Sequence, residues 1–147
     1  PKVISSGRKI NEKMAYYIFK KVINYFSVKK EKKIKKLNIG ILGLSFKENC
    51  PDIRNTKVID LINTFESLNC NVDVYDPWIH SEDALSEYNI QLIDKPYIKK
   101  YDAIVLAVAH DKIKKISLKE LKTYGKDNHV IYDIKYLFKS HEVDGRL

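Results

Sequence analysis

Apolar residues along this chain form short, dense runs separated by polar segments. Two nearly continuous runs, at Ile39–Leu44 and Ala103–Ala109, are typical of parallel strands that are buried on both faces. An alternating segment at Asn71–Tyr75, followed by Asp-Pro, predicts another strand, and His129–Tyr132 predicts a last one. Ile90–Ile93 is expected to add a brief edge strand.

Segments with helical spacing of apolar residues lie between the strands. The longest has its inner-face apolar residues between Val58 and Leu68, is expected to end near Asn69, and has Asn55 or Thr56 placed to cap its start. A shorter helix is predicted at Ser117–Tyr124 from the spacing of its leucines. Another is predicted at Ser81–Tyr88, where the acidic residues Glu82 and Asp83 favour the positive end of a helix. A regular alternation of strands and helices favours an α/β fold with a doubly wound parallel sheet, which is a Rossmann-like architecture.

Residues 1–36 differ from the rest of the chain in the pattern of their apolar and charged residues. Six apolar residues at helical spacing predict a long amphipathic helix: Ile10, Met14, Tyr17, Ile18, Val22 and Tyr25. The apolar stripe of this helix is expected to pack on another domain, on a second copy of the chain or on this domain's own core. The charged run Ser27–Lys36 predicts a linker. We therefore expect a helix and linker over 1–36 and an α/β domain over 37–147. Because the first residue is Pro1 rather than Met, a fragment of a longer protein is expected.

Composition narrows the classes of partner. The 147 residues carry a net charge of +8, which favours an anionic partner. The lysines are spread over predicted helix faces without a nucleic-acid-binding signature, so nucleic acid is not expected. Two isolated cysteines predict neither a disulfide scaffold nor a metal site. The absence of a long apolar run or a signal peptide makes a cytoplasmic protein without membrane contact the expectation.

The loop after the first strand carries the best candidate ligand-binding residues. In open parallel sheets the ligand lies beyond the carboxyl ends of the strands. Phe46 offers a flat surface for a base, and Lys47 offers a point charge for a diphosphate. Arg54 can bind a phosphate as a fork or pair with Asp52 to shape the loop, and both interpretations stay open. The glycine spacing of GILGLS differs from a dinucleotide-binding turn.

Other reactive side chains near strand ends have ordinary explanations. Cys50 has no evident general base beside it, so no catalytic residue is predicted. His110 follows a strand and either contacts a ligand, takes part in proton transfer or is a hydrogen-bonded structural residue. Asp76 either accepts from a ribose hydroxyl or simply ends its strand.

Four segments, in this order and spacing, carry a resemblance to a known family: GILGLSFKENCPDIRNTKVIDLI, VDVYDPW, AIVLAVAHD and VIYDIK. They resemble the C-terminal UDP-binding domain of the UDP-glucose/GDP-mannose dehydrogenase family, and GRKINEKM with its helix resembles the end of that family's central dimerisation domain. The FK-x(4)-D-x-R loop is the most specific part. AVAHD, DIKYL and VDGRL are most similar to the branch that acts on UDP-N-acetylhexosamines for capsule or O-antigen sugars.

The resemblance implies an enzyme that oxidises the C6 alcohol of a UDP-sugar to a carboxylate, with two NAD⁺ and a cysteine thioester. The NAD-binding domain and that cysteine would lie outside this chain, so the fragment itself is expected to be inactive. The resemblance also implies that the full-length protein is a homodimer. Phe46 and Lys47 fall on the family's nucleotide-contacting pair, and Arg54 falls on its loop arginine. Lys135 stands where the enzymes acting on UDP-glucose have an arginine that reaches the UDP, so the charge is kept and the fork is lost.

Two alternatives from other classes remain at this point. A receiver-like interaction module would use Asp76 or Asp133 as a switch site and show no preference for uridine. An NAD-binding domain proper would bind the dinucleotide at the glycine turn, although its glycine spacing is unfavourable.

Overall fold

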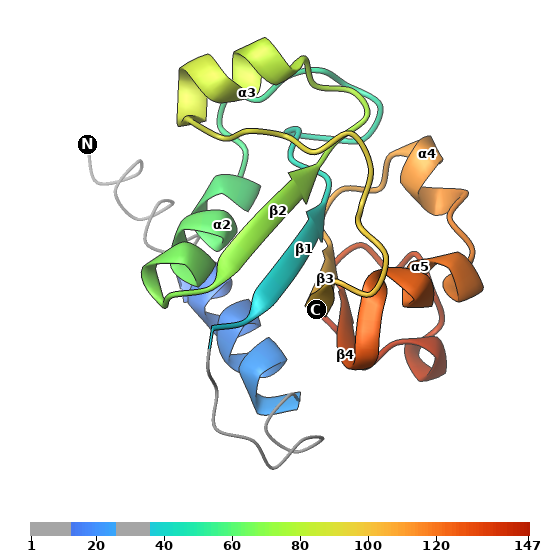
Figure 1. The fold of residues 1–147 in the computed structure, drawn as a ribbon. Coiled ribbons are helices and arrows are strands. Elements are labelled where there is room, and N and C mark those ends of the chain that lie inside the picture. Colours follow the sequence, from blue (N-terminus) through green and yellow to red (C-terminus); the bar gives the residue numbers. More distant parts are fainter. Residues whose placement is uncertain (1–12, 26–35) are drawn as a thin grey trace.

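A computed structural model describes residues 13–25 and 36–147 of the chain. Its centre is a five-stranded sheet in the order β2-β1-β3-β4-β5, in which every neighbouring pair is parallel. The strands are β1 (Asn38–Leu42), β2 (Asn71–Tyr75), β3 (Tyr101–Leu106), β4 (Gly125–Asp133) and β5 (Gly145–Arg146). Figure 1 shows β1 and β2 side by side, with β3 and β4 behind. The predicted α/β fold with a doubly wound parallel sheet is confirmed.

Helices connect the strands along the sequence. They are α2 (Val58–Ser67), α3 (Ser81–Tyr88), α4 (Asp111–Lys114) and α5 (Leu118–Tyr124), and a 3₁₀ turn, η1 (Ser140–Glu142), precedes β5. The Ser117 side chain caps α5 by accepting a hydrogen bond of 3.1 Å from the Glu120 amide. Asn89 ends α3 in the left-handed region, with φ of 55°, where asparagine is tolerated. The predicted helices therefore all form: α3 and α5 lie within one residue of their expected bounds, and α2 ends at Ser67, two residues before its expected end near Asn69.

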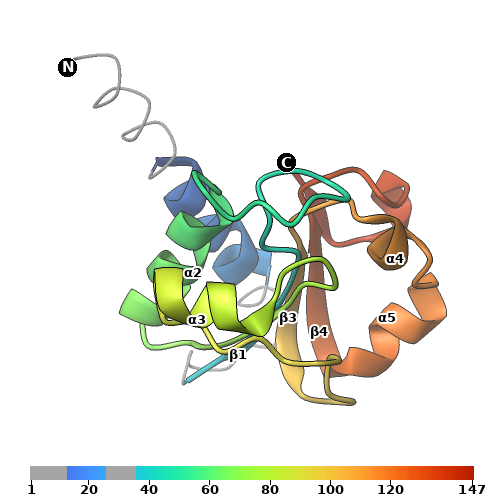
Figure 2. The same ribbon diagram turned by 90° about the horizontal axis from the view of Figure 1, so that it is seen from above.

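Two apolar layers cover the two faces of the sheet. Helices α2 and α3 contribute to one core together with Ile39, Ile41 and Val105. The other core contains Leu42, Ile104, Leu106 and Ile131 and is closed by residues of α4 and α5. Figure 2 shows α2 and α3 on one side of the strands and α4 and α5 on the other. Because strands β1 and β3 contribute to both cores, their sequences are mostly apolar, with Asn38 and Asp102 near their starts as the polar exceptions.

The helical stretch over residues 13–25 packs on this domain. Ala15, Ile18 and Val22 are buried in the same core as α2, and the rings of Phe19 and Phe65 meet edge to face at 5.5 Å between centroids. Both ribbon views place this stretch beside α2. Of the predicted stripe, Ile18 and Val22 therefore pack in the domain's own core and Tyr25 packs against it, whereas Met14 and Tyr17 are exposed and Ile10 lies outside the described residues. The predicted linker at 27–36 and the start of the predicted helix lie outside the described residues, except for Lys36.

Some predicted strand bounds were wrong. Residues 90–93 form no strand; the segment touches the sheet edge through the hydrogen bond from the Ile93 amide to the Val74 carbonyl, 2.9 Å. The run at 103–109 leaves the sheet after Leu106, because the amides of Ala107 and Val108 both bind the Leu42 carbonyl. The strand at 129–132 is not the last one, since β5 pairs with Tyr132 and Asp133.

The strand order defines where a ligand is expected. In a sheet of order 2-1-3-4-5 the connections from β1 and β3 leave toward opposite faces, which opens a crevice beyond the carboxyl ends of these two strands. The loops that follow Leu42 and Leu106 lie at this crevice.

Candidate functional site

A pocket of about 470 Å³ lies at this crevice. Its walls come from the loop after β1, the start of α2, the ends of β3 and β4, and the stretch 13–25. The lining residues are Met14, Ala15, Ile18, Ser45, Phe46, Lys47, Glu48, Thr56, Lys57, Val58, Leu61, Ala107, Val108, Ile134, Lys135 and Leu147. The pocket is therefore apolar over much of its wall and polar along the loop after β1.

The backbone at the end of β1 is shaped by close packing. Gly43 has φ of +105°, and a Cβ at this position would lie 2.5 Å from the Cβ of Val108. Thr56 then ties the far end of the loop back to its start: its Oγ1 donates to the Leu44 carbonyl at 2.6 Å and accepts from the Val58 amide at 3.2 Å. The side chain that the sequence predicted as a possible helix cap thus also closes the loop.

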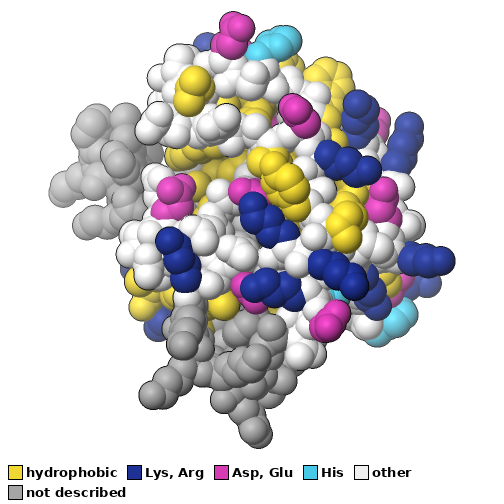
Figure 3. All heavy atoms as spheres, in the orientation of Figure 1, with side chains coloured by type: hydrophobic (Ala, Val, Ile, Leu, Met, Phe, Trp, Pro, Cys, Tyr) yellow, Lys and Arg dark blue, Asp and Glu magenta, His cyan; other side chains and the backbone are white. Residues whose placement is uncertain are grey.

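Three lysines and one glutamate line the pocket. Lys47, Lys57 and Lys135 are exposed and come from the loop, the start of α2 and the segment after β4. Glu48 is the one acidic residue among the lining residues in the described part of the chain. Over the face seen in Figure 3, by contrast, lysines and arginines are dispersed with acidic residues between them. The lining set is cationic overall and suits an anionic ligand.

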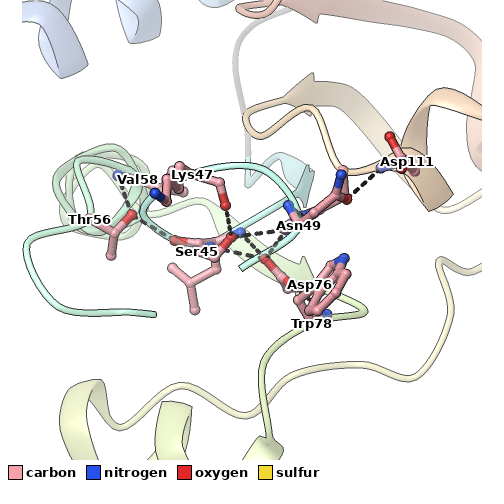
Figure 4. A network of polar contacts seen from close by, with 10 residues as sticks. Ser45, Lys47, Asn49, Thr56, Val58, Asp76, Trp78 and Asp111 are labelled. Atoms are coloured by element: carbon pink, nitrogen blue, oxygen red, sulfur yellow. Dashed lines mark hydrogen bonds and ion pairs between the residues drawn. The ribbon is translucent and has the colours of Figure 1, made fainter. Parts of the chain in front are cut away.

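Asp76 is the centre of a buried hydrogen-bond network behind the loop. Its Oδ2 accepts from the Leu44 and Ser45 amides at 2.7 and 2.9 Å and lies 2.9 Å from His110 Nε2, while Oδ1 accepts from the Trp78 amide at 2.8 Å. Burial raises the pKa of this carboxyl, but the hydrogen bonds from His110 and the three amides outweigh it and hold the pKa below its usual value. Figure 4 shows Ser45, Asn49 and Asp76 converging.

His110 is fully buried and both its ring nitrogens are occupied. Nδ1 accepts from the Asn49 amide at 2.9 Å, so the ring proton lies on Nε2 and is donated to Asp76. Ser45 Oγ is 3.0 Å from Nε2 and gives its own proton to the Lys47 carbonyl. Although serine, histidine and aspartate meet here, the arrangement leaves no basic nitrogen free to activate the hydroxyl. The structural interpretation of His110 is the one that this geometry supports.

Asp76 and Asp133 are both engaged by the protein. The side chain of Asp76 is completely buried. Asp133, also buried, accepts from the Lys135 amide at 3.1 Å and the Phe138 amide at 2.9 Å. Neither residue lines the pocket, so neither carboxylate is available there to a ribose hydroxyl. Within residues 13–25 and 36–147, no cluster of three histidine, cysteine or acidic side chains is arranged to hold a metal ion.

The predicted binding residues occupy different positions. Phe46, Lys47 and Lys135 line the pocket, and Phe46 is 53% exposed. Arg54 is not among the lining residues; its Nε and a terminal nitrogen bind the Asp52 carboxylate at 3.1 and 3.3 Å. This exposed pair lowers the pKa of Asp52 and raises that of Arg54. In this structure the loop-shaping interpretation of the pair is the one observed.

Several lining residues were missed from the sequence. Thr56 was considered only as a cap, Ile18 only as part of a helix, and Lys57 not at all. Their approach to the loop depends on contacts between distant segments. Val108 was assigned to a strand, whereas it forms a wall of the pocket. A local signal existed only for Lys57, which lies beside a predicted helix cap at the expected edge of the sheet.

None of the helices in the described ranges is both long and apolar enough to cross a membrane.

The family model of the UDP-glucose/GDP-mannose dehydrogenase family, UDP binding domain, matches residues 40–140. UDP-N-acetyl-D-glucosamine 6-dehydrogenases are similar over all 147 residues, at 38% identity in Salmonella typhi and 40% in Pseudomonas aeruginosa. The chain covers 34% and 35% of those two proteins, so it spans about a third of their length.

Solved structures show the same fold at low sequence identity. An NDP-N-acetyl-D-galactosaminuronic acid dehydrogenase from Methanosarcina mazei matches 92% of this chain and 28% of its own, with a TM-score of 0.78 and 22% identity. The UDP-N-acetyl-mannosamine dehydrogenase Cap5O of Staphylococcus aureus matches 99% of this chain and 32% of its own, with a TM-score of 0.71 and 20% identity.

Proposed function

Because this chain belongs to the UDP-glucose/GDP-mannose dehydrogenase family and carries its UDP binding domain, we propose that the pocket between β1 and β3 holds the UDP of a nucleotide sugar. The observation that supports this most directly is the convergence of Lys47, Lys57 and Lys135 on one pocket that Phe46 also lines. The lysines supply positive charge for a diphosphate, and the exposed ring of Phe46 supplies a surface for a base.

In this proposal the domain anchors the substrate and performs no chemistry. The whole protein is a UDP-sugar 6-dehydrogenase that converts a UDP-N-acetylhexosamine or UDP-glucose to the uronic acid, with two NAD⁺ per turnover, for capsule or O-antigen synthesis. It acts in the cytoplasm as a homodimer, with residues 1–36 from the end of the dimerisation domain. The similarity to the two UDP-N-acetyl-D-glucosamine 6-dehydrogenases favours the hexosamine branch.

NAD belongs to another domain in this proposal. The glycine turn of this chain does not fit a dinucleotide, because Val108 fills the space beside Gly43 where the backbone would need to be open to a pyrophosphate. The helix α2 also begins at Val58, well after the turn rather than directly from it. In this proposal, residues of this chain therefore take no part in the transfer of hydride from the sugar.

Calorimetric titration of the chain with UDP tests the proposal. Lys47→Ala removes a charged pocket residue and is expected to weaken UDP binding by about tenfold or more, the loss typical of a hydrogen bond to a charged group. Lys119→Ala is the matched control, because Lys119 is exposed on α5 and does not line the pocket. ADP provides a control for uridine preference.

Each result has a distinct meaning. Absence of UDP binding by the unmodified chain would contradict the proposed function. Unchanged affinity in Lys47→Ala would remove Lys47 from the site. Oxidation of UDP-N-acetylglucosamine by this chain with NAD⁺ would refute the assignment of the chemistry to another part of the protein.

A further inference from the structure

The part of the β1–α2 loop that lines the pocket is anchored at both of its ends by one buried pair. The pocket-lining residues of this loop segment are the consecutive residues 45–48. Asp76 binds the amides of Leu44 and Ser45 at the start of the segment, and His110 binds the amide of Asn49 at its end. Asp76 follows β2 and His110 follows β3, so the two anchors come from the neighbours of β1 on either side.

The second anchor is reinforced by the conformation of Asn49. This residue has φ of 54°, in the left-handed region, and its Oδ1 accepts from the Asp111 amide at 3.0 Å. The chain therefore turns at Asn49 while contacting both His110 and the first residue of α4. Between the anchors, the Ser45 hydroxyl donates to the Lys47 carbonyl at 2.9 Å, which fixes the backbone that bears the Lys47 side chain.

We propose that Asp76 and His110 are positioning residues for the UDP site and hold residues 45–48 in the binding conformation before the ligand arrives. This inference rests on the proposed function. Both side chains are completely buried and do not line the pocket, so they act through the loop. Their hydrogen bonds to one another and to the loop connect the segments that follow β1, β2 and β3. The ends of these three paired strands give the loop a rigid support.

The expected effect follows from the cost of ordering a loop. A loop that must be ordered on binding loses backbone conformational freedom, and this loss is subtracted from the affinity. If the binding conformation is populated a tenth of the time, the apparent Kd rises about tenfold without the loss of any direct contact. Removing the anchors should therefore weaken UDP binding by about tenfold or more.

Three substitutions at one position separate the two anchors. His110→Phe keeps a ring and removes both polar atoms. His110→Asn places an acceptor near the position of Nδ1 and can retain the Asn49 bond, while His110→Gln places a donor near the position of Nε2 and can retain the Asp76 bond. We expect the Asn and Gln variants to bind UDP more tightly than the Phe variant and more weakly than the unmodified chain. His80→Phe is the control, because His80 is exposed at the start of α3.

Amide hydrogen exchange of the ligand-free chain provides a measurement independent of UDP. In His110→Phe the amides of Leu44, Ser45 and Asn49 should exchange at least about tenfold faster, while amides of β3 and β4 keep their protection. A His110→Phe chain with protected β3 and β4 amides and unchanged UDP affinity would overturn the inference. If His110→Phe does not fold, the same comparison is made with the Asn and Gln variants, and wild-type affinity in both with faster exchange at the loop amides would overturn it. Absence of UDP binding by the unmodified chain bears on the proposed function, whereas the exchange result tests the anchors by themselves.

Discussion

Gly43 shows how strongly single positions at the crevice are constrained. Its φ of +105° is unfavourable for any residue with a side chain, and the space where a Cβ would lie is taken by Val108. The glycine thus lets the end of β1 approach the segment after β3, the two chain segments that flank the pocket. Its role in this structure is close packing of these two segments.

Gly43→Ala is expected to destabilise the domain by about 2–4 kcal/mol, from the strained φ and the overlap with Val108 together. Urea unfolding followed by circular dichroism measures this free energy. Ser86→Ala, on the exposed surface of α3, is the control and should change it by less than about 0.5 kcal/mol. A Gly43→Ala chain as stable as the control would mean that Val108 can move away at little cost.

The residues of the site were predictable where their signal was local. Phe46, Lys47 and Lys135 follow buried strands, and the rule for parallel sheets assigned them to the same edge, where the pocket lies. The pairing of Arg54 with Asp52 was one of two interpretations, since the sequence contains no information on which partner a surface arginine takes. The same rule places Asp76 and His110 at this edge, but no pattern along the chain indicated that they bind one another across 34 positions.

At the scale of elements, periodicity identified those that are stabilised by their own amphipathic pattern. Helices α2 and α5 bury apolar residues at helical spacing and were predicted from it. Helix α3, in which Ala84 is the only buried residue, was predicted from the capping and acidic residues at its start. Helix α4 has four residues and starts where Asn49 caps it from a distant loop, and β5 has two residues and exists through its pairing with β4. Such short elements depend on tertiary contacts, so their own sequences carry too little signal to predict them.

The stretch 13–25 provides a test of packing between elements. Ile18 is 4% exposed and packs in the core shared with α2, so Ile18→Ala should reduce the free energy of unfolding by about 2–5 kcal/mol. Asn24→Ala, at an exposed position of the same stretch, is the control for the change in helix propensity that alanine brings. The measurement is chemical denaturation of both variants. Equal stability of the two variants would show that this helix is not docked on the domain in solution.

For the whole molecule, the buried Asp76 carboxylate predicts a dependence of stability on acid. The folded state lowers its pKa below the ordinary value of 3.8, so near this pH the unfolded chain binds more protons than the folded chain. The stabilisation is therefore fully present above pH 4 to 5 and is lost as the pH falls through the folded pKa. Because the carboxylate is buried and joined to three strand ends, this loss concerns the whole domain.

Asp76→Asn should lower the free energy of unfolding by about 3 kcal/mol at pH 7. In the unmodified chain both carboxylate oxygens accept from backbone N–H groups, and the NH₂ group of asparagine cannot accept these hydrogen bonds. The variant should also lose less stability than the unmodified chain between pH 6 and pH 3, since it has no carboxyl to protonate here. Denaturation curves across this pH range measure both effects. Asp94→Asn, at an exposed position, is the control, and an identical pH profile for Asp76→Asn and the unmodified chain would contradict the lowered pKa.

The outer edge of β2 has a consequence for solubility. An open sheet ends in strands with unpaired backbone groups, and such edges can recruit strands of other molecules and lead to aggregation. Here the Ile93 amide occupies the Val74 carbonyl, and Asp73 on β2 is held by Lys100 at 2.8 Å and by the Tyr101 hydroxyl at 2.8 Å. The segment at 90–93 forms no strand, but it covers part of the outer edge of β2 and therefore protects this edge from pairing with other molecules.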